Sequence, residues 1–153
     1  MAAVEHIREV IASSFARLVD ETCDANGWAL VPASRSADTI GHEEFVRCYI
    51  LRCDADPART QRSWNVTAQV SCFAKTGTNV NLWKAVRMAD ALAAVLSHAD
   101  VTLRDSQADD PDATVGFLRL GRADATSLPI ADAENERFDQ AVLTIEGIAQ
   151  RTE

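Results

Sequence analysis

The feature of this sequence that most constrains its fold is a strict alternation of apolar and polar residues between positions 64 and 72. The even positions are apolar and the odd positions are polar: Trp64, Asn65, Val66, Thr67, Ala68, Gln69, Val70, Ser71 and Cys72. Neighbouring side chains of a β-strand point to opposite faces of the sheet, so this pattern predicts a strand with one buried face and one polar face. Sheets with one solvated face are typically antiparallel.

The segment before this strand supplies its expected partner. Residues 44–53 are rich in β-branched and aromatic side chains, whereas residues 54–60 contain Pro57 and few apolar residues. Two strands joined by a short connection pair most simply as an antiparallel hairpin. We therefore expect a long hairpin whose tip projects from the domain.

Two other segments have the spacing of helices. Apolar residues recur every three or four positions in residues 3–24, and Asn26 and Gly27 follow as a typical helix end. Residues 82–98 show the same spacing after a turn at 77–79 that supplies N-cap residues. Both segments are predicted to be amphipathic helices.

The rest of the chain is divided between strands and loops. Strands are predicted at 101–103, 114–120 and 138–148, with loops at 105–112 and 121–135. The order of the elements predicts an α+β fold, in which both helices pack on one face of a mostly antiparallel sheet. At 153 residues, the chain is predicted to form a single domain.

The charge balance excludes some classes of function. A formal net charge of −8 argues against a protein that grips DNA, because nonspecific nucleic-acid affinity comes from clustered Lys and Arg. An acidic wall is compatible with DNA that passes without binding. The longest strongly apolar run, residues 91–96, is far shorter than the roughly 20 residues of a spanning helix, so we expect no membrane partner. The charged N-terminal residues and the scattered cysteines indicate synthesis in a reducing cytoplasm without a signal peptide.

No motif in the sequence indicates catalysis. His6, His42 and His98 form no zinc-binding pair and are interpreted as surface or helix-capping residues. The turn at 77–79 lacks the flanking pattern of a phosphate-binding loop and is interpreted as a helix cap. The sequence therefore predicts a protein that is not an enzyme, with no catalytic residue, no metal site and no cofactor.

The four cysteines are predicted to be packing residues. Cys23 lies near the end of the first helix and Cys72 on the apolar register of its strand, both usual places for a buried free thiol. Cys48 and Cys53 stand five positions apart, so on a regular strand their side chains point to opposite faces. Without a bulge, these two residues cannot share a metal ion.

Three large apolar residues are candidates for an exposed subunit interface. They are Trp64 beside the hairpin connection, Trp83 in the first turn of the second helix, and Phe138 at the start of the last strand. Tryptophan is enriched at the centres of interfaces, although each of the three residues can instead complete the core. If the interface interpretation is right, Trp64→Asp or Trp83→Asp should impair assembly more than folding.

The order of these elements resembles a known family. An N-terminal helix, a long hairpin around a Pro-containing connection, the turn at 77–79 before an Ala-rich helix, and a long last strand together resemble the tail terminator proteins of long-tailed bacteriophages. These proteins are also called tail completion or minor tail proteins. The resemblance covers nearly the whole chain and rests on order and local character, because no diagnostic motif is present.

The resemblance implies a structural virion protein at the head-proximal end of the tail. Such a protein forms a homohexameric ring that docks on the last ring of the tail-tube protein and ends tube polymerisation. The ring also joins the tail to a head-tail connector or stopper protein in the neck, and DNA passes through its channel without specific binding. No catalysis is implied.

Two groups of residues are candidates for contacts of such a ring. By position in the hairpin connection, Asp56, Arg59 and Arg62 are expected to contact the tail tube or the connector. Asp109, Asp110 and Asp112 of the acidic loop are candidates for lining the channel, where six copies would repel DNA. An ordinary solvated loop is the alternative for this segment.

Other functions remain compatible with the sequence. A tail-tube subunit or a head-tail connector component would also be a ring builder without catalysis, and self-assembly separates it from a terminator. A small α+β ligand-binding protein or enzyme would need a concave site with convergent polar groups.

Overall fold

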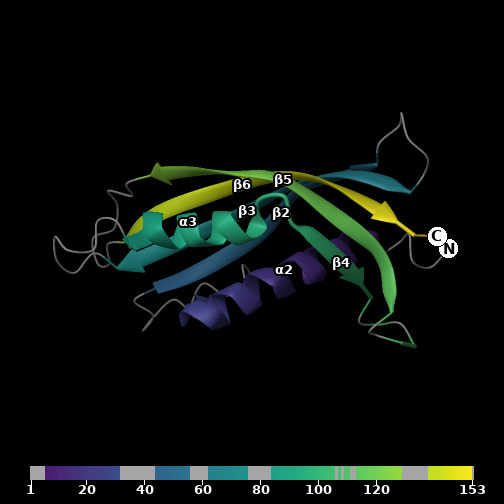
Figure 1. The fold of residues 1–153 in the computed structure, drawn as a ribbon, viewed down its shortest axis with the longest axis horizontal. Helices are drawn as coiled ribbons and strands as arrows, with labels where there is room; N and C mark the ends of the chain where they lie inside the picture. The colour runs from purple at the N-terminus through teal and green to yellow at the C-terminus, as the bar shows by residue number, and fades with distance from the viewer. Residues whose placement is uncertain are drawn as a thin grey trace.

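The computed structural model describes residues 6–31, 44–55, 62–75, 84–105, 107, 109–110, 113–128 and 138–152. Within them lie two helices and six strands (Figure 1). In chain order these are α2 (Ile7–Asn26), β1 (Ala29–Leu30), β2 (Glu44–Ala55), β3 (Ser63–Lys75), α3 (Lys84–Leu96), β4 (Asp100–Arg104), β5 (Thr114–Leu128) and β6 (Phe138–Arg151). The predicted α+β class is confirmed.

The strands form one sheet in the order β1-β2-β3-β6-β5-β4. All neighbours are antiparallel except β1 and β2, which pair in parallel, so the sheet is mixed. The expected antiparallel pairing of β2 with β3 is present from Glu44 and Ala74 to Ala55 and Trp64. The tip predicted to project between these strands falls at residues 56–61, outside the described residues.

The two helices cover the sheet in different ways. Helix α3 lies over the middle strands and contacts β3, β5 and β6, whereas α2 contacts β1 and β2 at one border and β4 at the other (Figure 1). One helix can touch both borders only because the sheet is strongly curled. Helix α2 therefore closes the open side of the curl.

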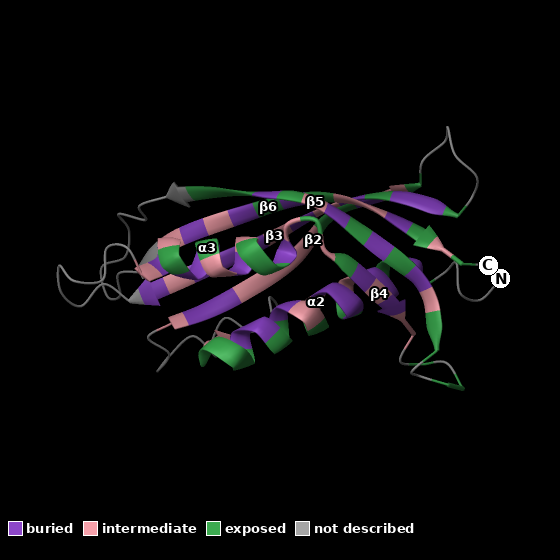
Figure 2. Cartoon of the chain, in the orientation of Figure 1, coloured by how far each residue is buried: buried purple, intermediate pink, exposed green. Residues whose placement is uncertain are grey.

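A single hydrophobic core lies between the helices and the sheet. The alternation on β3 is realised as predicted: its apolar side chains from Trp64 to Ala74 are buried, and they belong to one cluster with the apolar sides of both helices (Figure 2). The largest fully buried side chains include Phe15, Met88, Leu92 and Leu143. Both helices thus pack on one face of the sheet.

The predicted end of the first helix is confirmed. Gly27 adopts the left-handed conformation with φ 74°, and its N–H contacts the carbonyl oxygens of Asp24 and Cys23. A left-handed residue just past a helix is most easily glycine, because glycine has no Cβ to clash. The side-chain amide of Asn26 donates to the carbonyl oxygen of Thr22 at 2.8 Å, so the last turn extends to Asn26.

The prediction of a loop from residue 121 was wrong for its first part. Strand β5 continues to Leu128, and Ala123, Ala125 and Thr126 pair with residues of β6. The register shifts between Leu120 and Ala123, which breaks the alternation that a strand shows in the sequence. Small residues of low strand propensity then follow, and only pairing with β6 holds them extended.

The prediction that Cys48 and Cys53 point to opposite faces was also wrong. Cys48 pairs with Val70 and Cys53 with Val66, both on the core side, because the register shifts between Ile50 and Arg52. This bulge leaves Leu51 without a partner on β3. The cysteines' partners Val70 and Val66 are four residues apart on β3. At roughly 3.3 Å for each residue, the two cysteines lie about 13 Å apart along the sheet, so they cannot share one ion.

Candidate functional site

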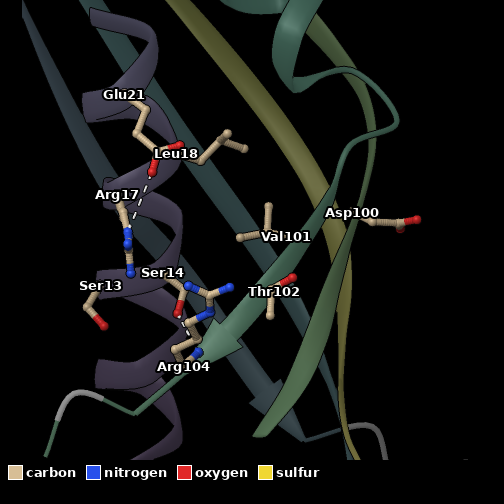
Figure 3. A pocket seen from close by; sticks show the side chains of 9 residues that line it. All are labelled: Ser13, Ser14, Arg17, Leu18, Glu21, Asp100, Val101, Thr102 and Arg104. Atoms are coloured by element: carbon tan, nitrogen blue, oxygen red, sulfur yellow. Dashed lines mark hydrogen bonds and ion pairs between the residues drawn. The ribbon is translucent and has the colours of Figure 1, made fainter. Parts of the chain in front are cut away.

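A groove runs along the line where α2 meets the outermost strand β4 (Figure 3). It has a volume of about 290 Å³ and is called the α2–β4 groove below. Its residues come from one side of α2 and from β4: Ser13, Ser14, Arg17, Leu18, Glu21, Asp100, Val101, Thr102 and Arg104. The lining therefore combines hydroxyl and charged side chains with two apolar ones.

Three of the four charged residues of the groove have a counter-charge within the groove or beside it. On α2, the Nε atom of Arg17 lies 3.5 Å from a carboxylate oxygen of Glu21. On β4, Asp100 accepts a hydrogen bond of 3.1 Å from Nε of Arg119 on β5. All four of these side chains are more than half exposed, so each pair contributes little to stability, about 0–1 kcal/mol.

Arg104 differs from these pairs. Its backbone N–H donates to the Oγ atom of Ser14 at 3.1 Å, which fixes the end of β4 against α2 (Figure 3). The Nε atom of its side chain is buried and has no hydrogen-bond partner within the described residues. Buried polar atoms are nearly always hydrogen-bonded, so an unpartnered guanidinium nitrogen beside a groove needs an explanation.

A second hollow, of about 660 Å³, lies over β2, β3, β6 and β5, where the sheet is bulged. The two register shifts fall in one row, because Arg52 pairs with Thr67, Thr67 pairs with Glu146, and the shift in β5 lies opposite Glu146. Bulges bend the strands that carry them, so this row is a line of bending across the sheet. Arg52 forms an ion pair with Asp54 at its rim.

The buried thiols are packing residues, as predicted. Burial raises the pKa of Cys23 and of Cys72 to about 12 and the pKa of Cys48 to about 11, with negative neighbours such as Asp20 adding to the effect on Cys23 and Cys48. Burial also raises the pKa of Cys53. A thiol with a raised pKa is protonated at neutral pH and is a poor nucleophile or metal ligand. All four cysteines are free.

The part of the chain that the structure describes contains neither a cluster of metal ligands nor a membrane-spanning helix. No group of three His, Cys, Asp or Glu residues there is arranged to hold a metal ion. Neither described helix is long and apolar enough to cross a membrane. His6 and His98 are exposed, and His98 follows α3 with a positive φ of 59°, whereas His42 lies outside the described residues.

The three predicted interface residues differ in how far the structure describes them. Trp64 is 6% exposed and belongs to the core, which is the alternative that the sequence left open for each of these residues. The apolar register of β3 directs its side chain toward the core. Phe138 begins β6, with its backbone paired to Lys75, and its side chain is not described. Trp83 lies outside the described residues.

The residues expected to contact other tail components are only partly described. Arg62 is exposed, and its carbonyl oxygen accepts a hydrogen bond of 2.9 Å from the backbone N–H of Arg151. Asp109 and Asp110 are also exposed. Asp56, Arg59 and Asp112 lie outside the described residues.

Sequence reasoning missed the α2–β4 groove. The signal available for it was Ser14, a polar residue on the apolar stripe of α2 that is only 8% exposed. Nothing in the local sequence marks Arg104 as its partner, because the two residues are 90 positions apart and meet only when α2 closes the curl.

Strands β2 and β5 lie just inside the short outermost strands β1 and β4, and they are called the border strands below. Long stretches of both have no strand neighbour on the outer side in the described part of the chain. On its outer side, β2 pairs with β1 only at Phe45 and Val46, so residues 48–55 have no strand partner there among the described residues. Strand β5 pairs with β4 from Thr114 to Arg119, and residues 122–128 likewise have no outer strand partner in the described part. The two unpaired stretches lie at opposite borders of the sheet.

Comparison with known proteins gives a similarity of fold. No protein-family model matches the chain, and no curated protein sequence matches it. A solved structure of a protein whose name states no function is similar with a TM-score of 0.63 and 11% sequence identity, over 94% of this chain and 95% of that chain. At this identity, the similarity shows a shared fold alone.

Proposed function

We propose that this protein is a structural, non-catalytic subunit of a ring that caps the tail tube of a long-tailed bacteriophage. In this role it ends polymerisation of the tube and joins the tail to the head connector. The observation that carries the proposal is a pair of strand borders without an outer strand neighbour in the described part of the chain, residues 48–55 of β2 and 122–128 of β5. The sequence resemblance supplies the biological setting.

The two borders suit a head-to-tail assembly. A strand edge presents a row of N–H and C=O groups that can pair with another chain. Contacts between two different surfaces of each subunit generate closed rings when the rotation between subunits closes. Because the unpaired stretches belong to opposite borders, one copy can offer β5 where the next copy offers β2.

The charge of the chain supports a passage for DNA more than a grip on it. The net charge is −8, and the exposed Asp109 and Asp110 follow β4 in a loop segment. Repeated around a ring, such carboxylates would repel phosphates and prevent the DNA from adhering. In this proposal, Asp109 and Asp110 line the channel, while Arg62 belongs to a surface that contacts the tube or the connector.

The test is negative-stain imaging and native mass spectrometry of the purified protein, alone and with preformed tail tubes. Closed rings, or a density that caps one end of a tube, would support the proposal. Unlimited tubes would replace it with a tail-tube subunit. A monomer that ignores tube ends at high concentration would overturn the ring altogether.

Proline substitutions in β5 provide a matched pair of variants. Ala125 and Thr126 are both exposed and adjacent, and successive N–H groups of a strand alternate between its two neighbours. Proline removes one N–H donor, so one of the two variants weakens pairing with β6 and the other removes a donor from the free border. We expect one variant to keep the wild-type Tm and lose ring formation. Intact rings in both variants would exclude this border as the subunit contact.

A further inference from the structure

We propose that the α2–β4 groove is a carboxylate-binding site in which the guanidinium group of Arg104 contacts the ligand. The proposal does not rest on the ring function, because it concerns the chemistry of one groove. Its starting observation is the buried Nε atom of Arg104, which lacks a hydrogen-bond partner within the described residues.

The arginine is fixed at its backbone, while the Nε donor of its side chain has no partner in the described part of the chain. Its backbone N–H is bonded to Ser14, so the end of β4 is fixed, and Figure 3 shows the guanidinium group between β4 and α2 beside Ser14. A guanidinium group presents its N–H donors in a rigid fork that matches the two oxygens of a carboxylate. A preorganised fork with an unsatisfied nitrogen is therefore suited to this ligand.

The charges of the groove select a ligand with one negative charge. Arg17 lies beside Glu21, and Asp100 is bonded to Arg119, so these charges are already balanced. Arg104 is the one charged side chain of the lining without an ion pair in the described part of the chain. A single uncompensated positive charge matches a carboxylate, whereas a doubly charged phosphate would be repelled by Glu21 and Asp100.

The lining also offers neutral hydrogen-bond donors and enough room. The hydroxyl of Ser14 accepts from Arg104 and retains its own proton for donation, and Thr102 contributes a second hydroxyl from β4. The hydroxyl of Ser13 is bonded to the carbonyl oxygen of Val10 at 3.2 Å. The volume of about 290 Å³ exceeds the share of one water molecule, about 30 Å³, and accommodates a group the size of a carboxylate side chain.

Two sources of such a carboxylate are possible in chemical terms. One is an Asp or Glu side chain of a second copy of this chain, which has 23 acidic against 15 basic residues. The other is a free small carboxylate. Both would accept hydrogen bonds from the same guanidinium group. The first experiment therefore tests whether the groove binds a carboxylate, and a later one tests whether that carboxylate belongs to a second copy or to a free small molecule.

The chemistry is tested by thermal unfolding with sodium acetate as the probe and sodium chloride at equal ionic strength as the reference. At a free concentration of ten times its Kd, a ligand that binds only the folded state should raise the Tm of a domain of this size by about 3–6 °C. Arg104→Gln should abolish the rise, and Arg17→Gln should retain it. An equal Tm in acetate and chloride, or an equal rise in both variants, would overturn the proposal.

A second measurement guards against loss of folding in Arg104→Gln. In wild-type protein, ¹⁵N spectra of the arginine Nε–H groups should show a saturable shift for Arg104 with acetate, beyond any shift of the exposed Arg119. Equal shifts of both resonances would indicate nonspecific ion effects and overturn the site.

Sedimentation velocity then identifies the source. If acetate and Arg104→Gln both reduce self-association, the ligand is a side chain of a second copy. If self-association is unchanged while the acetate effects persist, the ligand is a free carboxylate. Either result supports the site, and because ring formation is scored separately, failure of the site and failure of the proposed function are distinguishable.

Discussion

The centre of the sheet and its borders are built differently. Strands β3 and β6 pair along their whole length, from Ser63 with Gln150 to Lys75 with Phe138, and each has a further strand on its other side. The border strands β2 and β5 each carry a register shift and are paired on the outer side over only part of their length. Exposed apolar side chains occur on both border strands, with Leu51 57% and Phe117 46% exposed.

This difference separates stability from assembly. A strand that is paired on both sides and buried on one face satisfies its backbone and its apolar side chains within the chain. A border strand leaves backbone groups available to a partner, and a bulge there changes which residues face outward. We therefore expect substitutions in the centre to change folding and substitutions in the borders to change association.

The largest expected effect is a cavity in the centre. Leu143 on β6 is fully buried, so Leu143→Ala should lower the free energy of unfolding by about 2–5 kcal/mol, through lost burial and an unfilled cavity. The matched border variant is Leu51→Ala, which should change it by less than about 0.5 kcal/mol because this side chain is mostly exposed. Urea unfolding measures both variants. Equal losses would remove the distinction between centre and border.

A smaller effect is expected at Gly147, where β6 closely approaches β5. A Cβ atom added at Gly147 would lie 2.8 Å from the carbonyl oxygen of Arg119 and 3.2 Å from Leu118 Cδ1. Gly147→Ala should therefore cost about 1–3 kcal/mol, because a backbone carbonyl in a ladder cannot move aside easily. Chemical denaturation would show the loss, and a variant as stable as the wild type would mean that the two strands separate without cost.

The smallest expected effect is a pH dependence that arises in the centre. Burial raises the pKa of Cys72 on β3 from 9.0 to about 12, with Cys23 adding to the shift. The thiol of the unfolded chain ionises first, so this contribution to stability is fully present below pH 9 and is lost as the pH rises toward 12.

Urea unfolding at pH 8 and pH 10 checks this contribution. For one such thiol, the free energy of unfolding should be about 1.4 kcal/mol lower at pH 10 than at pH 8. Cys72→Ala should reduce this pH dependence by the same amount. If the substitution leaves the pH dependence unchanged, Cys72 is ionised as easily in the folded chain as in the unfolded one.

The sequence by itself determined the local elements of this protein. The alternation on β3 and the end of α2 at Gly27 were predicted correctly, because both depend on residues that are adjacent in the chain. The burial of Cys23 and Cys72 also followed from their local registers. Pairing of β2 with β3 followed from their closeness in the sequence.

The tertiary structure alone decided the features that depend on distant partners. The bulge at Leu51 turns Cys48 and Cys53 to one face, and pairing with β6 extends β5 to Leu128, although its sequence there resembles a loop. The curl of the sheet brings Arg104 to Ser14. A register shift or a closed curl is stabilised by contacts far apart in the chain, and no local pattern of residues encodes them.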